Sequence, residues 1–234
     1  MSFVPTIPQE GFMLFLDRRD AGRRLTGHLM AFRGPDVVVV GLAGGGVAVA
    51  AEIAARLRVL LDVMVVHDLR PGRSTPPFGA IAERGVRVVD HDRARALPTE
   101  ASELTRIERH ERDALRRRIE RFRSLRPRGG LAGRTVVIVD EGLTCAARAR
   151  AACRAAYAHG SIRVVFATPV AATPAIEALT GDADKVVCLH TPDHLDNIAD
   201  HYRNFEPIDD EDIYNLLHRP RPGELTSCAP RRAG

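Results

Sequence analysis

The chain has 234 residues, which is enough for one large domain with a sizeable hydrophobic core. Its 45% of hydrophobic and 27% of charged residues exclude a wholly disordered protein. The net charge of +4 is too small to indicate nucleic-acid binding by itself. Aromatic residues make up only 5% and tryptophan is absent, so the core must consist mainly of Val, Leu, Ile and Ala.

The N-terminal part predicts a helix, a strand and a second helix. Asp17 is a good cap for a helix that runs to about Ala31. Residues 36–42 form a continuous apolar run, which is typical of a strand buried on both faces of a parallel sheet. This run ends at the glycine loop 43–46, and residues 47–57 then have the apolar spacing of a helix.

The next segment predicts a second buried strand at residues 62–67. The polar stretch 68–77 contains proline and glycine and predicts irregular structure. We expect order to return at residues 78–83, followed by a short strand at 86–90 and a long charged helix at 100–122.

The C-terminal part continues the alternation of strands and helices. Residues 134–140 predict the third buried strand, followed by a loop and a helix that ends near His159. Residues 162–168 and 185–189 predict the fourth and fifth strands. Short helices are expected between those two strands, at 174–179, and near the end, at 209–217.

This alternation predicts an α/β fold with a doubly wound, mainly parallel five-stranded sheet and flanking helices. We expect an N-terminal extension at 1–11, the folded domain at 12–218 and a disordered tail at 219–234. Sheets of this kind bind ligands at the carboxyl ends of their strands. The candidate loops therefore follow Leu42, His67 and Asp140.

The strongest motif is the acid pair Asp140-Glu141 at the end of an apolar strand. Two carboxylates there can accept hydrogen bonds from vicinal sugar hydroxyls or help to hold Mg²⁺. The start of the next helix offers unpaired N–H groups to a phosphate. One ligand that satisfies both is a ribose 5-phosphate. The alternative is that the acid pair is only a polar strand end.

The segment 136–148 resembles the PRPP-binding signature of type I phosphoribosyltransferases, in which two acids follow an apolar strand. Further segments resemble a bacterial branch of stand-alone proteins in that family, in the same order along residues 12–217. They are Phe15-x-Asp17-Arg18-x-x-Ala21-Gly22, the glycine loop, Phe78-Gly79-Ala80-Ile81-Ala82-Glu83, the 108–123 helix and Tyr202-Arg203-Asn204-Phe205. The resemblance implies the type I phosphoribosyltransferase fold with a small hood.

The resemblance also implies a set of site residues. Asp140 and Glu141 would be the catalytic acids and would take part in holding Mg²⁺, directly or through the substrate. The 5-phosphate would be bound by Gly142, Leu143, Thr144, Cys145, Ala146, Ala147 and Arg148. Pyrophosphate would lie against Ala43, Gly44, Gly45 and Gly46, with Arg70 and Arg73 in a flexible loop above it.

Three departures from the family pattern weaken the contacts to phosphate. Cys145-Ala146-Ala147-Arg148 replaces Thr-Gly-x-Thr, and Ala43-Gly44-Gly45-Gly46 replaces Pro-Arg-Gly-Gly. His67-Asp68 replaces Arg-Lys, which brings an acid close to the expected pyrophosphate. Arg148 could compensate by binding a phosphate with two N–H groups. Cys145 could be a nucleophile at a helix start or a simple replacement of Thr, and we favour the replacement.

Two functions follow. The first is transfer of ribose 5-phosphate from PRPP, with Mg²⁺, to an acceptor that the sequence does not identify. The second is a catalytically inactive relative with the same fold that acts as a nucleotide- or phosphate-sensing protein, a regulatory binding protein or a partner subunit. A dinucleotide-binding Rossmann protein is disfavoured, because the glycine loop lacks G-x-G-x-x-G spacing. With no signal peptide and no membrane-length apolar run, we expect a cytoplasmic protein, and we expect a homodimer.

Overall fold

The computed structural model describes residues 15–72, 75–125 and 129–219. The extension expected at 1–11, nearly all of the tail expected at 219–234 and Arg73 lie outside these residues.

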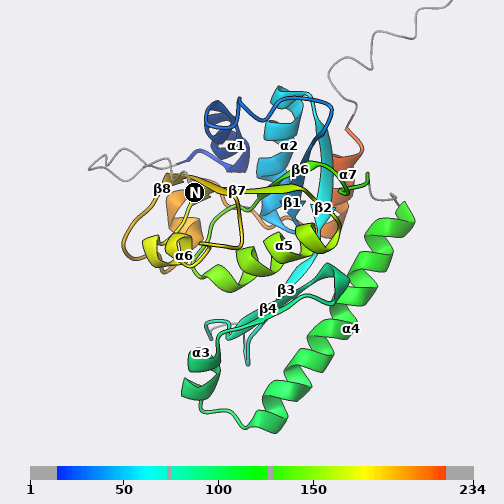
Figure 1. Ribbon diagram of the computed structural model, residues 1–234. Helices are drawn as coiled ribbons and strands as arrows, with labels where there is room; N and C mark the ends of the chain where they lie inside the picture. The colour runs from blue at the N-terminus through cyan, green and yellow to red at the C-terminus, as the bar shows by residue number, and fades with distance from the viewer. Residues whose placement is uncertain (1–14, 73–74, 126–128, 220–234) are drawn as a thin grey trace, which may run out of the picture.

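A five-stranded parallel sheet forms the centre of the molecule (Figure 1). Its strands lie in the order β2-β1-β6-β7-β8, and every neighbouring pair is parallel. They are β1 (Val37–Leu42), β2 (Leu60–Met64), β6 (Thr135–Val139), β7 (Arg163–Val170) and β8 (Lys185–His190). The expected five-stranded, doubly wound α/β fold is therefore confirmed. The chain winds outward in opposite directions from β1 and β6, so the topological switch lies between these two strands.

Helices cover both faces of this sheet, as Figure 1 shows. On one face lie α1 (Arg18–Gly27), which Asp17 caps as expected, and α2 (Gly45–Leu57). On the other lie α5 (Ala146–Ala158) and α6 (Thr173–Glu177). Successive strand residues face opposite sides, so Val38 and Val40 pack with the α5 cluster and Val37 and Val39 with the α2 cluster.

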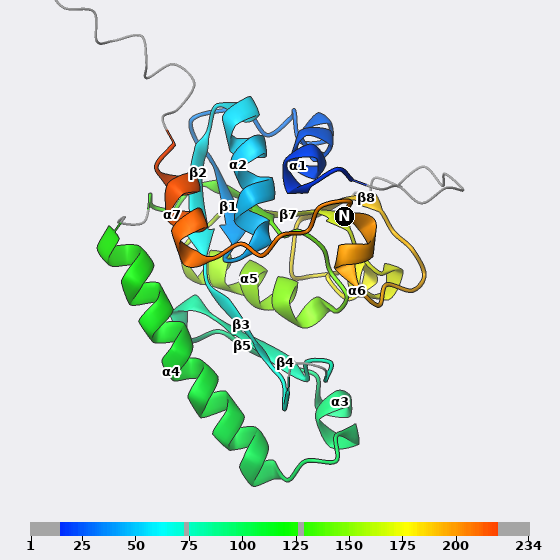
Figure 2. The ribbon, with the colours of Figure 1, turned by 180° about the vertical axis from the view of Figure 1, so that it is seen from behind.

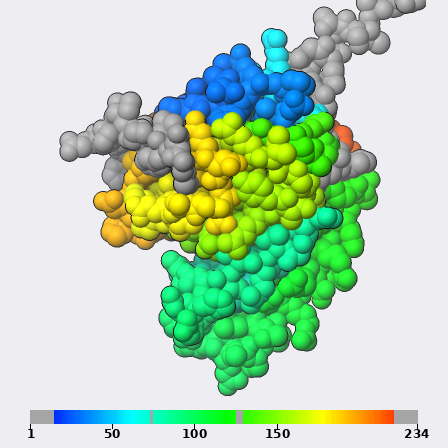
Figure 3. All heavy atoms as spheres, viewed as in Figure 1, coloured from blue at the N-terminus to red at the C-terminus, as the bar shows by residue number. Residues whose placement is uncertain are grey.

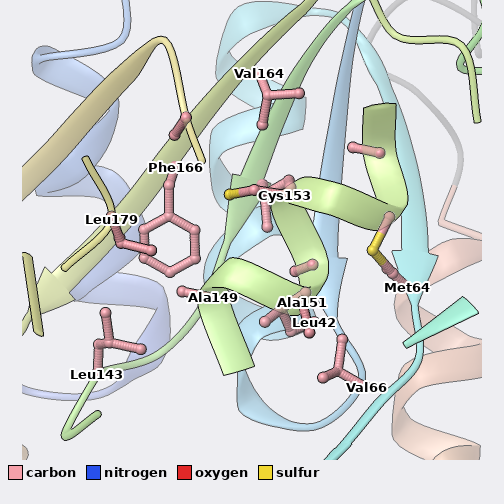
Figure 4. Packing of buried hydrophobic residues seen from close by; sticks show 14 of the residues in the cluster. Leu42, Met64, Val66, Leu143, Ala149, Ala151, Cys153, Val164, Phe166 and Leu179 are labelled. Carbon is pink, nitrogen blue, oxygen red and sulfur yellow. The ribbon is translucent and has the colours of Figure 1, made fainter. Parts of the chain in front are cut away.

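The α5 face shows how a core without tryptophan is filled. Figure 4 shows Leu42, Met64 and Phe166 of the strands beside Ala149 and Cys153 of α5. Phe166 is completely buried, and the alanines of α5 let the helix pack closely on the sheet.

A second, antiparallel sheet lies beside the first (Figure 2). It consists of β3 (Val66–Leu69), β4 (Gly79–Ala82) and β5 (Arg87–Val89). The long helix α4 (Ala101–Leu125) packs against it, and the short helix α3 (His91–Ala96) follows β5. In Figure 3 these segments form a lobe below the rest of the molecule.

The strand expected at 62–67 is wrong as a single element. The chain leaves the central sheet after Met64 and enters the antiparallel sheet at Val66. Between them, the N–H of Val65 donates to the carboxylate of Glu83 (3.1 Å) and not to a neighbouring strand. Asp68 is consequently part of β3, where it pairs with Ala80, and the irregular stretch is shorter than 68–77.

Most remaining elements lie within a few residues of the expected ones, but α1 ends at Gly27 and not near Ala31, and α3, η1 (Glu83–Gly85) and η2 (Ile198–His201) were not predicted. Asp90 caps α3 by accepting from the N–H of Arg93 (3.0 Å). With η1 and η2, α7 (Asp210–Leu217) completes the fold. Asp209 begins α7 in a capping box, as the acidic start of the 209–217 segment indicated. Within the ranges that the structure describes, no helix is long and apolar enough to cross a membrane.

Candidate functional site

A cleft of about 260 Å³ opens at the carboxyl edge of the central sheet, at the switch between β1 and β6. Its walls come from the loops after β1 and β6, from the antiparallel sheet and from η2. The lining residues are Ala43, Gly44, Asp68, Arg70, Pro77, Asp140, Glu141, Gly142, Leu143, Thr144, Cys145, Arg148 and Ile198. The structure thus brings most of the sequence-predicted site residues together.

Asp140 lies on the floor of this cleft, directly after β6. Its Oδ1 accepts a hydrogen bond from the N–H of Glu141 (2.9 Å). Burial raises its pKa from 3.8 to about 6, while the charge of Arg148 acts in the opposite direction. The carboxyl group is therefore poised to change its charge close to neutral pH.

Arg148 reaches across the cleft from the first turn of α5. Its Nε lies 3.3 Å from Oδ2 of Asp140. Its two terminal nitrogens donate to the carbonyls of Val66 (3.2 Å) and Ala43 (3.3 Å). Burial disfavours the charge of Arg148, but the nearby carboxylates of Asp140 and Asp68 outweigh it and raise the pKa. These contacts tie the guanidinium to the protein, so it does not extend freely toward a phosphate.

Glu141 points the other way, toward the start of α2. Its carboxylate accepts a hydrogen bond from Nε of Arg18, and its main-chain carbonyl accepts one from the hydroxyl of Tyr202 (2.6 Å). Arg18 is itself buried, lies 3.8 Å from the ring centre of Phe205 and donates to the carbonyl of Glu206 (2.7 Å). The two acids of the motif therefore have different surroundings.

The glycine loop has a smaller share of the cleft than expected. Ala43 and Gly44 line it, and Gly44 precedes α2 with a φ of 128°, a conformation that favours glycine. Gly45 and Gly46 instead form the buried first turn of α2. A Cβ on Gly45 would overlap the carboxylate of Glu141 and the guanidinium of Arg18. Gly45 is thus required for close packing around the Glu141 side chain.

The segment after Glu141 connects β6 to α5. A Cβ on Gly142 would lie 2.5 Å from Cγ2 of Ile198, and buried Leu143 donates its N–H to the carbonyl of Val170 (3.0 Å). Thr144 and Cys145 line the cleft, whereas the following alanines, Ala146 and Ala147, begin α5 and line an adjoining pocket of about 300 Å³.

Cys145 caps α5 without a side-chain hydrogen bond to the helix. Burial and the charge of Asp68 raise the pKa of its thiol. A thiol of this kind is not activated as a nucleophile, which favours the simple replacement of Thr.

Asp68 and Arg70 form the wall on the side of the antiparallel sheet. Arg70 is paired with Oδ2 of Asp68, so the arginine expected above a pyrophosphate neutralises an acid of the same wall. Asp68 Oδ1 is buried and accepts no hydrogen bond from any described residue; Nη1 of Arg148 lies 3.9 Å away.

Sequence reasoning missed several residues of this site. For Tyr202 and Phe205, sequence reasoning favoured packing against the terminal helix over stacking on a base or substrate. Arg18 was noted only as part of the resemblance, and Asp68 only as a departure from it. The sequence has no local signal for Arg18, because the burial of its side chain and its pairing with Glu141, 123 residues away, become visible only in the fold.

Two other polar residues named in the sequence analysis do not line the cleft. His67 pairs with Glu111 of α4 (2.8 Å), and Glu83 pairs with His159 at the far end of α5 (3.2 Å).

Asp140 and Glu141 do not form a free pair of ligands for Mg²⁺. The first is paired with Arg148 and the second with Arg18. Among the described residues, no three His, Cys, Asp or Glu side chains are grouped in a way that could hold a metal ion. The donor set therefore does not fit an ion held by the protein itself.

The fold and the cleft define an α/β protein with a candidate ligand site at a topological switch point. Comparison with known proteins then gives the family, because the model of the phosphoribosyl transferase domain matches residues 19–201. The chain belongs to the phosphoribosyltransferase family.

Two relatives are informative. A Mycobacterium tuberculosis protein, provisionally named a phosphoribosyl transferase, is 44% identical over 207 residues. The match covers 88% of this chain and 47% of that protein, so the chain spans about half the length of this relative. The crystal structure of the protein TT1426 from Thermus thermophilus is similar with 37% identity and a TM-score of 0.71, covering 88% of this chain and 98% of the other.

Proposed function

We propose that the chain is a phosphoribosyltransferase that takes PRPP in the cleft between β1 and β6 and transfers its ribose 5-phosphate group to an acceptor. The observation that carries this proposal is the position of Asp140. A buried carboxylate directly after β6 lies in one cleft with the start of α5, at the switch point of the sheet. Family membership supports the same reaction class. It does not favour the alternative of an inactive sensor.

The start of α5 suits the 5-phosphate of such a ligand. The first N–H groups of a helix lack partners within it, and the helix dipole favours an anion at this end. Thr144 and Cys145 bring this end of the 13-residue helix to the cleft. Because alanines follow, the backbone must supply most of the phosphate contacts.

Asp140 suits the ribose. A carboxylate has about four acceptor sites, and the two contacts of Asp140 leave room for a sugar hydroxyl. Its negative charge lies in a partly dehydrated cleft, where it stabilises positive charge that develops on the sugar ring as the bond from C1 to pyrophosphate breaks. The acceptor forms the new bond to C1, loses its proton, and pyrophosphate leaves.

The test measures both binding and reaction. Asp140→Asn should weaken PRPP binding in calorimetry by tenfold or more, since a hydrogen bond to a charged group is worth about 1.5–3 kcal/mol. Pyrophosphate release in the presence of a panel of candidate acceptors should fall in the same variant. Asp210→Asn is the matched control, because Asp210 pairs with Arg118 outside the residues that line the cleft. Equal PRPP affinity of Asp140→Asn and the natural chain would rule out this site.

A further inference from the structure

We infer that the Arg148 guanidinium is a built-in cation that takes the place of a divalent metal ion in this cleft, so that the cleft binds its phosphorylated ligand without Mg²⁺. Only the statement about the ligand depends on the proposed function. The statement that Arg148 excludes a metal ion can be tested on the protein alone.

The first argument is the set of oxygens around Arg148. Two are carboxylate oxygens, of Asp140 at 3.3 Å and Asp68 at 3.9 Å. Two are main-chain carbonyls, of Val66 at 3.2 Å and Ala43 at 3.3 Å. We call these four atoms the oxygen cage. Carboxylates and carbonyls are the ligands that hard divalent cations take in proteins.

The second argument is the origin of the cage. Ala43 follows β1, Asp140 follows β6, and Val66 and Asp68 belong to β3. One guanidinium thus joins the carboxyl edge of the central sheet to the antiparallel sheet. A spherical ion would draw these oxygens to within roughly 2–2.6 Å of itself, whereas the planar fork of arginine spans longer distances.

The third argument is charge balance. Among the residues that the structure describes, three carboxylates line the cleft, and each has an arginine: Arg148 for Asp140, Arg18 for Glu141 and Arg70 for Asp68. A divalent ion added to this set would face carboxylates that are already neutralised, next to a guanidinium that is always charged. Its entry would require Arg148 to leave, which would uncover the two carbonyls.

The experiment uses Mn²⁺ as the probe and measures the electron paramagnetic resonance signal of the free ion, with no other ligand present. The natural chain should leave the signal unchanged. Arg148→Met keeps the aliphatic stem but removes the charge, so it should gain saturable Mn²⁺ binding. Adding Asp140→Asn to that variant should abolish the gain.

Two further variants control for structure and charge. Arg154→Met makes the same change on the same helix, but its partner Asp182 keeps Arg150, so no Mn²⁺ binding is expected. Arg148→Lys retains a positive charge and should bind no Mn²⁺. If Arg148→Met does not fold, the natural chain and Arg148→Lys still decide. Mn²⁺ binding by either of these two proteins overturns the inference if Asp140→Asn abolishes that binding. A folded Arg148→Met that gains no Mn²⁺ binding also overturns it.

A second measurement joins the inference to the ligand. PRPP affinity of the natural chain, measured with Mg²⁺ and with a chelator, should agree within about twofold, well under the 1.4 kcal/mol of a tenfold change. Binding only with Mg²⁺ would overturn the inference and leave the proposed function standing. Absence of any PRPP binding, together with the expected Mn²⁺ results, would remove the proposed function and leave the role of Arg148 standing.

Discussion

The hydroxyl of Tyr202 donates a 2.6 Å hydrogen bond to the main-chain carbonyl of Glu141, although 61 residues separate them in the sequence. Burial and the charge of Glu141 raise the pKa of this phenol, so it remains a donor over the whole working range of pH. Tyr202 also packs on Phe15 and Phe205, with ring centres 5.3 and 5.0 Å apart. The segment after η2 therefore fixes the backbone of the acid motif.

We predict that Tyr202→Phe destabilises the protein by about 1–3 kcal/mol, because it leaves the partly buried carbonyl of Glu141 without its donor. Urea unfolding measures this change. Tyr157→Phe removes a hydroxyl that donates to Asp184 (2.8 Å) from an exposed side chain, and we expect a smaller loss there. Equal losses in the two variants would contradict the role assigned to Tyr202.

Gly45→Ala should destabilise the protein by about 1–3 kcal/mol through overpacking. The added methyl group would overlap the side chains of Glu141 and Arg18. Gly27→Ala is the control: nothing lies within 4 Å of a Cβ at that position, and alanine near a helix end should be neutral or stabilising. In a double-mutant cycle, Glu141→Ala should relieve part of the Gly45→Ala cost, and purely additive effects would refute the proposed contact.

PRPP affinity should depend on the ionisation of Asp140. Burial raises its pKa to about 6, so the carboxylate that accepts from ribose is lost as the pH falls below that value. Calorimetry should show an affinity that falls up to about tenfold per pH unit there. Asp140→Asn separates this effect from the ligand's own phosphate, which titrates near pH 6. Parallel pH profiles for the two proteins would contradict the prediction.

The Asp140 carboxyl should affect PRPP binding and folding stability in opposite directions as the pH changes. A pKa of about 6 in the folded chain lies above the ordinary value of 3.8, so the folded state binds more protons between these values. The contribution of Asp140 to the free energy of unfolding is therefore largest in acid and is lost as the pH rises through about 6.

The rings of His190 and His201 lie 5.4 Å apart, and burial lowers the pKa of both. The pKa of His201 is lowered further by the charge of His190, while Asp200 acts in the opposite direction. The pKa of both rings in the folded chain is thus below the ordinary value of 6.5. The stability that the neutral rings contribute is therefore fully present above pH 6.5 and is lost as the pH falls from there through the folded pKa. His190→Asn with His201→Asn should weaken the fall of the thermal unfolding midpoint as the pH drops below the ordinary histidine pKa of 6.5. An unchanged slope would show that this pair does not control the acid limit.

Much of the fold could be predicted because its signals are local. Unbroken runs such as residues 37–42 and 135–139 are apolar on both faces, as buried parallel strands must be. The break at Val65 could not be predicted in this way, because residues 60–69 have no glycine or proline to mark it. The partner that the Val65 N–H takes at this break is Glu83, 18 residues further on, which no local pattern shows.

The sequence also predicted where the candidate site lies, but not the contacts within it. The strand end before Asp140 marked the cleft, and the resemblance assigned the loop after it. The partners of the acids were not predictable, because the pairing of Arg18 with Glu141 spans 123 residues. For Arg148, sequence position gave the correct place on α5 but could not show that carbonyls of Ala43 and Val66 bind its guanidinium.

Because the chain passes from β2 into β3, the two walls of the cleft belong to two different sheets. Asp140 stands on the rigid parallel sheet, whereas Asp68 stands on the antiparallel sheet beside α4. Inside the cleft, Arg148 joins the two walls through Asp140 and the carbonyl of Val66. Outside it, Glu111 and Arg123 of α4 pair with His67 of the antiparallel sheet and Asp62 of the central sheet (both 2.8 Å). Helix α4 thus contacts both of the sheets that carry the walls of the cleft, from outside the cleft.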